Sequence, residues 1–156
     1  MADWLTHILI GLIAIELLSF KYTLVKEQRA LVLVSSILPD LGNFTMLMGE
    51  LGSNLGPFFE AVHTPVGFLF LAGLVSYGFK REWVRAGFLL ILLGGLLHIA
   101  ADLLIVSLDG KVMLLFPFSL EKYSLNVFRQ GEFAYLGIVF VLAIIVFSFV
   151  RLYRLR

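Results

Sequence analysis

A histidine and an aspartate four residues apart, His98 and Asp102, lie in the apolar stretch 94–105. On a helix this spacing puts both side chains on one face, one turn apart. Burying ionisable groups in an apolar helix is costly, so they need partners or a metal ion. Imidazole and carboxylate are both ligands of Zn²⁺. The pair therefore indicates a buried metal site, with a structural His–Asp pair or a proton relay as alternatives.

Further ligand types stand at the ends of other apolar stretches. Asp40 follows one stretch, His63 precedes the next, and His7 lies near the start of the first. Two histidines and two carboxylates (His63, His98, Asp40 and Asp102) would complete one four-ligand site. The second oxygen of Asp102 could bridge to another ion held by His7. We therefore expect one or two divalent ions, with Zn²⁺ the best match.

The composition identifies the kind of protein that carries these residues. Of 156 residues, 60% are hydrophobic and 15% are charged, whereas soluble domains average ~25% charged residues. This predicts an all-α membrane helix bundle that forms a single domain over residues 1–156. The net charge of +1 gives no indication of nucleic acid as a partner, and the absence of cysteine excludes disulfides and thiolate metal sites. The oligomeric state is left open.

Apolar stretches predict five membrane-spanning helices: Trp4–Phe20, Thr23–Leu38, Thr64–Phe79, Trp83–Leu108 and Phe133–Val150. The first should be a retained helix and not a signal peptide, because no small-residue cleavage site follows it. Pro39 should end the second helix, and Thr64 with Pro65 is typical of a helix start. The intervening segments Leu41–Phe59 and Val112–Leu125 should be irregular loops that shape a substrate pocket.

The distribution of basic residues predicts the orientation in the membrane. With an extracytoplasmic N-terminus, nine of the 12 lysines and arginines face the cytoplasm: Lys21, Lys26, Arg29, Lys80, Arg81, Arg85, Arg151, Arg154 and Arg156. Lys111, Lys122 and Arg129 lie outside. The same topology brings all three histidines, Asp40, Asp102 and Glu132 to the outer side. We therefore expect a multi-pass inner (plasma) membrane protein with an extracytoplasmic site and a cytoplasmic C-terminus.

Several short motifs carry a resemblance to a known family. The opening Asp3–Gly11, the Ser36–Asp40 motif, His63-Thr64, His98–Asp102 and Phe116–Ser119 follow one another as in the inner-membrane-associated metal-dependent hydrolases, some of which are LexA-regulated. That family is similar to zinc-dependent phospholipase C and P1 nuclease, which are all-helical phosphoesterases. The resemblance implies that Asp40, His63, His98 and Asp102 hold one zinc ion and that His7 belongs to another site.

The chain departs from these patterns at three positions. Gly42, Phe58 and Phe128 stand where the related enzymes often have a further aspartate or histidine. A full trinuclear cluster is therefore not expected, and one or two ions are.

The predicted activity is hydrolysis of a phosphoester in a lipid or lipid-linked substrate by metal-activated water. Glu132 or Glu60 could act as the base, with Glu132 an alternative ligand. Arg129 and the helix start at Thr64 could bind the substrate, since free N–H groups there favour an anion. Two alternatives stay open: a proton- or ion-coupled transporter that uses His98 and Asp102, and a non-catalytic protein with a structural metal.

Overall fold

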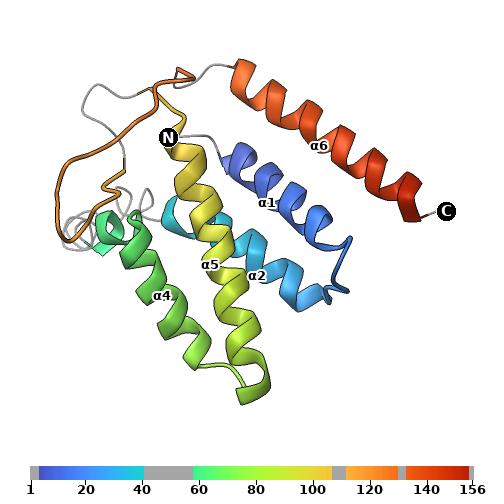
Figure 1. Cartoon of the computed structure of the whole chain (residues 1–156), viewed down its shortest axis with the longest axis horizontal. Helices are drawn as coiled ribbons and strands as arrows, with labels where there is room; N and C mark the ends of the chain where they lie inside the picture. The colour runs from blue at the N-terminus through green and yellow to red at the C-terminus, as the bar shows by residue number, and fades with distance from the viewer. Residues whose placement is uncertain (1–3, 41–57, 107–111, 130–132, 155–156) are drawn as a thin grey trace, which may run out of the picture.

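The computed structural model describes residues 4–40, 58–106, 112–129 and 133–154. Its helices are α1 (Trp4–Leu18), α2 (Lys26–Ile37), α4 (Pro65–Tyr77), α5 (Arg81–Leu103) and α6 (Phe133–Arg154) (Figure 1). A short helical segment at 58–62 and a 3₁₀ turn at 38–40 complete the helical parts. The described residues contain isolated β-bridges but no strand. The all-α prediction is confirmed.

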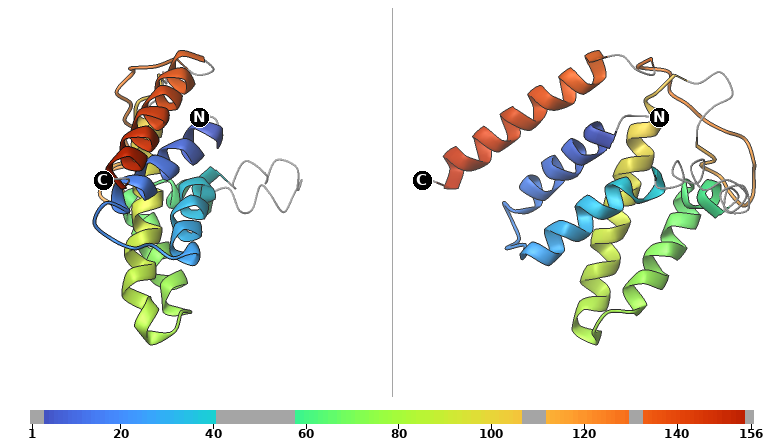
Figure 2. Two further views of the ribbon diagram at one scale, coloured as in Figure 1. Left: turned by 90° about the vertical axis from the view of Figure 1, so that its right-hand side faces the viewer. Right: turned by 180° about the vertical axis from the view of Figure 1, so that it is seen from behind.

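The helices form a fan in which neighbours along the fan pack against each other. Helix α1 lies between α6 and α2, and α5 packs against α2 and α4 (Figures 1 and 2). Because α1 and α2 run in opposite directions, the start of α1 comes close to the end of α2. The ends of α2 and α5 and the start of α4 approach the same region. This arrangement brings the segments that hold the histidines to one end of the bundle.

Two glycines allow α5 to lie unusually close to its neighbours. A Cβ added at Gly94 would lie 2.0 Å from Ser35 Oγ and 2.6 Å from the Val32 carbonyl oxygen of α2. A Cβ at Gly95 would lie 1.9 Å from the Phe68 ring of α4. Phe68 is fully buried there, together with Ile91 and Ile99 of α5. The glycine pair therefore sets the spacing of the three helices just before His98.

Only part of the predicted membrane topology is confirmed. Among the described residues, two helices have the length and composition to cross a membrane, α5 with 23 residues and α6 with 22. At 1.5 Å per residue they extend ~35 and ~33 Å, which matches a bilayer core of ~30 Å. The apolar helices α1 and α4, with 15 and 13 residues, are shorter, and α2 has 12. Five helices form, but five full spans are not confirmed.

Helix boundaries agree with several local predictions and correct others. Helix α2 ends at Ile37, and Pro39 and Asp40 lie in the 3₁₀ turn that follows, as expected from the proline. The prediction that α5 extends to Leu108 is wrong. It ends at Leu103, because Ile105 leaves the helix and forms a bridge with Phe128. The apolar stretch continues past Leu103, so composition alone does not predict where the helix ends.

The predicted loops are only partly described. Most of Leu41–Phe59 lies outside the described residues, and its last two residues already belong to the helical segment 58–62. The described part of Val112–Leu125 is irregular, as predicted, with Val112 buried and bridged to Tyr123. Phe118 is 95% exposed.

Candidate metal centre

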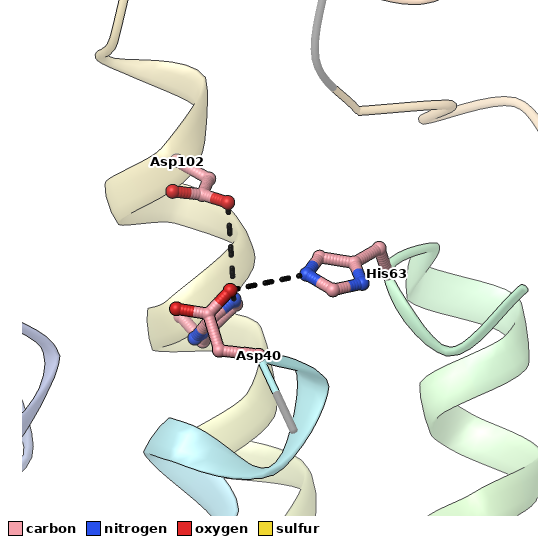
Figure 3. Close-up of side chains that lie close together, drawn as sticks. Asp40, His63 and Asp102 are labelled. Carbon is pink, nitrogen blue, oxygen red and sulfur yellow. Dashed lines mark ion pairs between the residues drawn. The ribbon is translucent and has the colours of Figure 1, made fainter. Parts of the chain in front are cut away.

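Five predicted ligands meet at one end of the bundle. His7 lies on α1, Asp40 in the turn after α2, His63 just before α4, and His98 with Asp102 on α5. Figure 3 shows Asp40, His63 and Asp102 pointing toward one another from these separate elements. Asp40, His7, His98 and Asp102 are between 0 and 2% exposed. The sequence stretches are far apart, so the fold itself assembles the group.

The donor atoms are spaced as ligands and not as direct hydrogen-bond partners. Asp40 Oδ1 lies 3.5 Å from His63 Nε2 and 3.8 Å from His98 Nε2. Asp102 Oδ2 lies 3.8 Å from His98 Nε2. Two ligands of a tetrahedral Zn²⁺, each about 2.1 Å from the ion, are roughly 3.4 Å apart. Donor atoms of Asp40, His63, His98 and Asp102 all lie within 4.8 Å of one another, so these residues fit a single ion.

Backbone carbonyls fix the tautomers of two histidines. The Nδ1–H of His98 donates to the Ser36 carbonyl at 2.9 Å, and the Nδ1–H of His63 donates to the Phe59 carbonyl at 3.0 Å. Since a carbonyl can only accept, Nδ1 carries the proton in both rings. In the neutral rings, the Nε2 lone pairs therefore face the carboxylates. Histidines that bind metals are commonly oriented in this way.

This arrangement needs a positive charge at its centre. His98 Nε2 and His63 Nε2 are buried and have no hydrogen-bond partner among the described residues. A neutral Nε2 and a carboxylate oxygen are both acceptors, so they do not stabilise each other directly. Burying a carboxylate costs several kcal/mol before its partners offset that cost, and here two carboxylates are buried in one group. A divalent cation would accept both kinds of lone pair and balance the two negative charges.

A proton can occupy the group when no metal is bound. Burial lowers the pKa of His63, but the contact with Asp40 and the Phe59 carbonyl raise it more, so the pKa lies above its usual value. The two aspartates thus favour a cation at this position, either a proton on the ring or a metal beside it.

The carboxylates divide their oxygens between two sides. His7 Nε2 lies 3.7 Å from Asp40 Oδ2 and 3.7 Å from Asp102 Oδ1, whereas His63 and His98 face the other oxygens. The His7 ring stacks on the His98 ring with centroids 3.9 Å apart. Both aspartates, and not only Asp102 as predicted, therefore present an oxygen to each side.

The remaining predicted site residues have other surroundings. The Thr64 hydroxyl accepts from Gly67 N–H and donates to the Ala61 carbonyl, so it caps α4 as predicted. Glu60 is exposed and pairs with Lys122 at 3.6 Å, and Arg129 is exposed after the Phe128 bridge. The structure does not bring any of these three into the ligand group. Glu132 lies outside the described residues.

Sequence reasoning missed the two carbonyl groups that orient the histidines. Every residue type has a backbone carbonyl, so the residue type of Phe59 does not indicate that its carbonyl binds a histidine. Ser36 stands in the motif before Asp40, but its hydroxyl bonds to the Leu33 carbonyl of its own helix. Its contribution to the site is the main-chain oxygen.

Of three comparisons with known proteins, one gives a match. A search of curated proteins and a search of solved structures both find no significant match. A family model described as YdjM inner membrane protein matches residues 1–155. That match covers the whole bundle and all five ligands. The chain belongs to the YdjM inner membrane protein family.

Proposed function

We propose that this protein is a membrane-embedded, metal-dependent hydrolase that cleaves a phosphoester of a lipid or lipid-linked substrate. The observation that carries the proposal is the convergence of three histidines and two aspartates, with their donor atoms spaced for a metal in a buried group. When bound, a divalent metal polarises a phosphoryl oxygen and lowers the pKa of a coordinated water.

The chain's own residues supply the framework for that chemistry. Asp40 and Asp102 concentrate negative charge that holds the cation, and the Ser36 and Phe59 carbonyls keep two imidazole rings in position. Glu132 and Glu60 stay predictions for the base. Of these, Glu60 is already paired with Lys122.

His63 provides an access route. Its side chain is 19% exposed, while those of His7, Asp40 and His98 are fully buried and that of Asp102 is 3% exposed. A catalytic metal needs an open coordination position, in contrast to a closed structural one. Approach from the His63 side is the route we propose for the substrate.

The position along the helices supports a membrane substrate. Asp102 is one residue before the end of α5, a helix long enough to span the bilayer. His98 is one turn deeper. A ligand group at the end of a span lies near the depth of lipid headgroups. From this depth and the bias of basic residues, we propose that the site is extracytoplasmic and that the C-terminus is cytoplasmic.

A structural metal site is the second candidate, and the near-complete burial of four ligands favours it. The two functions differ in their products. The full chain in lipid nanodiscs should be analysed for bound metal and then incubated with phospholipids and with a soluble phosphodiester, with products identified by mass spectrometry. Cleavage that stops after chelation and returns with Zn²⁺ supports the hydrolase. Bound metal without cleavage of either substrate contradicts it.

Three ligand variants and one control variant sharpen this experiment. His98→Ala and Asp102→Ala should lose both metal and cleavage, and the matched control Glu82→Gln, an exposed carboxylate at the other end of α5, should keep both. His7→Ala should lose less metal than His98→Ala, because His7 contacts only the second oxygen of each aspartate. Equal loss in the two histidine variants would contradict the two-sided arrangement.

A further inference from the structure

A second charged cluster lies at the end of the bundle opposite the metal centre, where α1 ends, α2 begins and α6 ends. Glu16 Oε1 lies 3.4 Å from Arg29 Nη1, and Glu16 Oε2 lies 3.7 Å from Arg154 Nη2. One carboxylate therefore faces two guanidinium groups from two other helices, which leaves an excess of positive charge.

The arginines keep donors for a further partner. Arg154 Nη2–H also donates to Ser19 Oγ at 2.5 Å, and Arg29 Nε–H donates to the Leu24 carbonyl at 3.4 Å. A guanidinium group has five N–H donors. Within the described residues, Nε and Nη1 of Arg154 make no hydrogen bond or ion pair, and Arg151, three residues earlier, has no ion pair.

These groups line a groove between α1 and α6. The groove has a volume of about 430 Å³ and is lined by Glu16, Phe147, Ser148, Val150, Arg151 and Arg154. It combines two guanidinium groups and a hydroxyl with an apolar wall. Aromatic contacts also join α6 to the segment after α1, since the Phe20 ring lies 5.8 Å from the Phe149 ring and 5.3 Å from the Tyr153 ring.

We propose that this groove binds a phosphate-bearing anion, with the headgroup of an anionic phospholipid as the source that best fits its place. Guanidinium groups match phosphate oxygens in geometry as well as charge. Basic pockets between membrane helices on the cytoplasmic side bind anionic headgroups. Phe147, which is 40% exposed, would contact the adjoining acyl chain. The site goes beyond the proposed hydrolase activity and does not depend on it.

Lipid retention tests the proposal directly. The full chain would be purified in mild detergent, incubated with phosphatidylglycerol or phosphatidylcholine, and examined by native mass spectrometry. Wild type should retain phosphatidylglycerol preferentially. Arg151→Gln should lower that retention several-fold, and the double variant Arg151→Gln/Arg154→Gln should remove the preference. Arg85→Gln removes the same charge from an exposed position on α5 and should leave the preference intact.

A competition arm identifies the source of the phosphate. Inorganic phosphate that displaces the lipid at millimolar concentration indicates a site for a soluble anion, and failure to displace it indicates that the acyl chain contributes. Either result supports phosphate binding if the arginine variants weaken it. Equal retention by wild type, Arg85→Gln and the double variant overturns the proposal. An unchanged far-UV circular dichroism spectrum and melting temperature in each variant show that the fold is intact, so a loss of retention is not caused by unfolding.

Discussion

The two ends of the bundle bury charge in opposite ways. At the metal end, Asp40 and Asp102 face three imidazole rings at 3.5 to 3.8 Å, with both buried carboxylates in one group. At the other end, Glu16 lies between Arg29 and Arg154. The second cluster contains its own counter-charges, whereas the first groups four residues that could hold a metal ion. The same residue class, a carboxylate inside a helical bundle, thus belongs to a candidate cation site at one end and to an ion-pair cluster with two arginines at the other.

The largest effect should follow from replacing Asp40 by asparagine. Asp40 is fully buried and faces His7, His63 and His98. Asn keeps the shape but removes the charge, so we expect metal content to fall to background, measured by mass spectrometry of the purified protein. At a pH above the pKa of His63, the metal-free Asp40→Asn protein should melt no lower than metal-free wild type, because the change removes one of two neighbouring buried negative charges.

Metal content and melting temperature, measured together on Asp40→Asn, distinguish a metal site from a structural His–Asp pair. If Asp40 were stabilising the fold through the histidines alone, Asp40→Asn would lower the melting temperature of the metal-free protein. Chelation would then leave wild type unaffected. Under our interpretation, wild type loses about 2.7 kcal/mol of ligand stabilisation when a metal held at 100 times its Kd is removed.

A smaller effect should follow from Gly94→Ala. The added Cβ would lie 2.6 Å from the Val32 carbonyl and 2.0 Å from Ser35 Oγ, so α5 and α2 must separate. His98 and the Ser36 carbonyl lie on these two helices. Disturbing such an orienting contact typically weakens metal binding about 10- to 100-fold. Isothermal titration with Zn²⁺ would measure the change.

Gly73→Ala is the matched control. It lies on α4, where an added Cβ has nothing within 4 Å. Replacing a helical glycine by alanine there should stabilise the fold by about 1 kcal/mol and leave the Zn²⁺ affinity unchanged. Equal affinities in the two alanine variants would show that the α2–α5 distance does not set the ligand geometry.

Much of the metal end could be predicted from the sequence because its chemistry is encoded by residue type. His98 and Asp102 are one helical turn apart in an apolar stretch, and Pro39 and the Thr64-Pro65 pair predict where the helices that carry Asp40 and His63 end and begin. The positive-inside pattern then predicts that these residues lie at one depth in the membrane. The structure brings together all five predicted ligands.

The other end was not predicted, and the reason is physical. The partners of Glu16, which are Arg29 and Arg154, lie 13 and 138 positions away in the sequence, and no periodicity links them. The five-span count is not confirmed for a related reason. Hydropathy measures apolar composition and not the length over which helical hydrogen bonds continue. It therefore cannot predict that α5 ends at Leu103 within an apolar stretch or that α4 ends after 13 residues.

Lower pH should weaken metal binding in a graded way. Metal binding requires His63 without a proton on Nε2, and its pKa in the metal-free site is raised despite the lowering effect of burial, because of Asp40 and the Phe59 carbonyl. The proton therefore begins to compete at a higher pH than at an ordinary histidine. Below that pKa, affinity should fall about tenfold per pH unit for each proton displaced. Titrations in buffers of different ionisation enthalpy would count these protons, and a count of zero would contradict the assignment.

The smallest effect should come from Glu16→Gln, and its sign sharpens the contrast between the two ends. Removing this charge leaves Arg29 and Arg154 facing each other without their shared carboxylate. The arginine side chains are 37 and 49% exposed, so solvent screens the pairs and the loss should be about 1 kcal/mol or less. A slightly lower melting temperature with full metal content is the expected result.

Glu27→Gln is the control for this prediction. Glu27 is an exposed carboxylate on α2 without an ion pair among the described residues, so its replacement should change neither the melting temperature nor the metal content. A carboxylate replacement thus lowers stability where the protein supplies the cation, and it lowers metal content where the cation must come from solution.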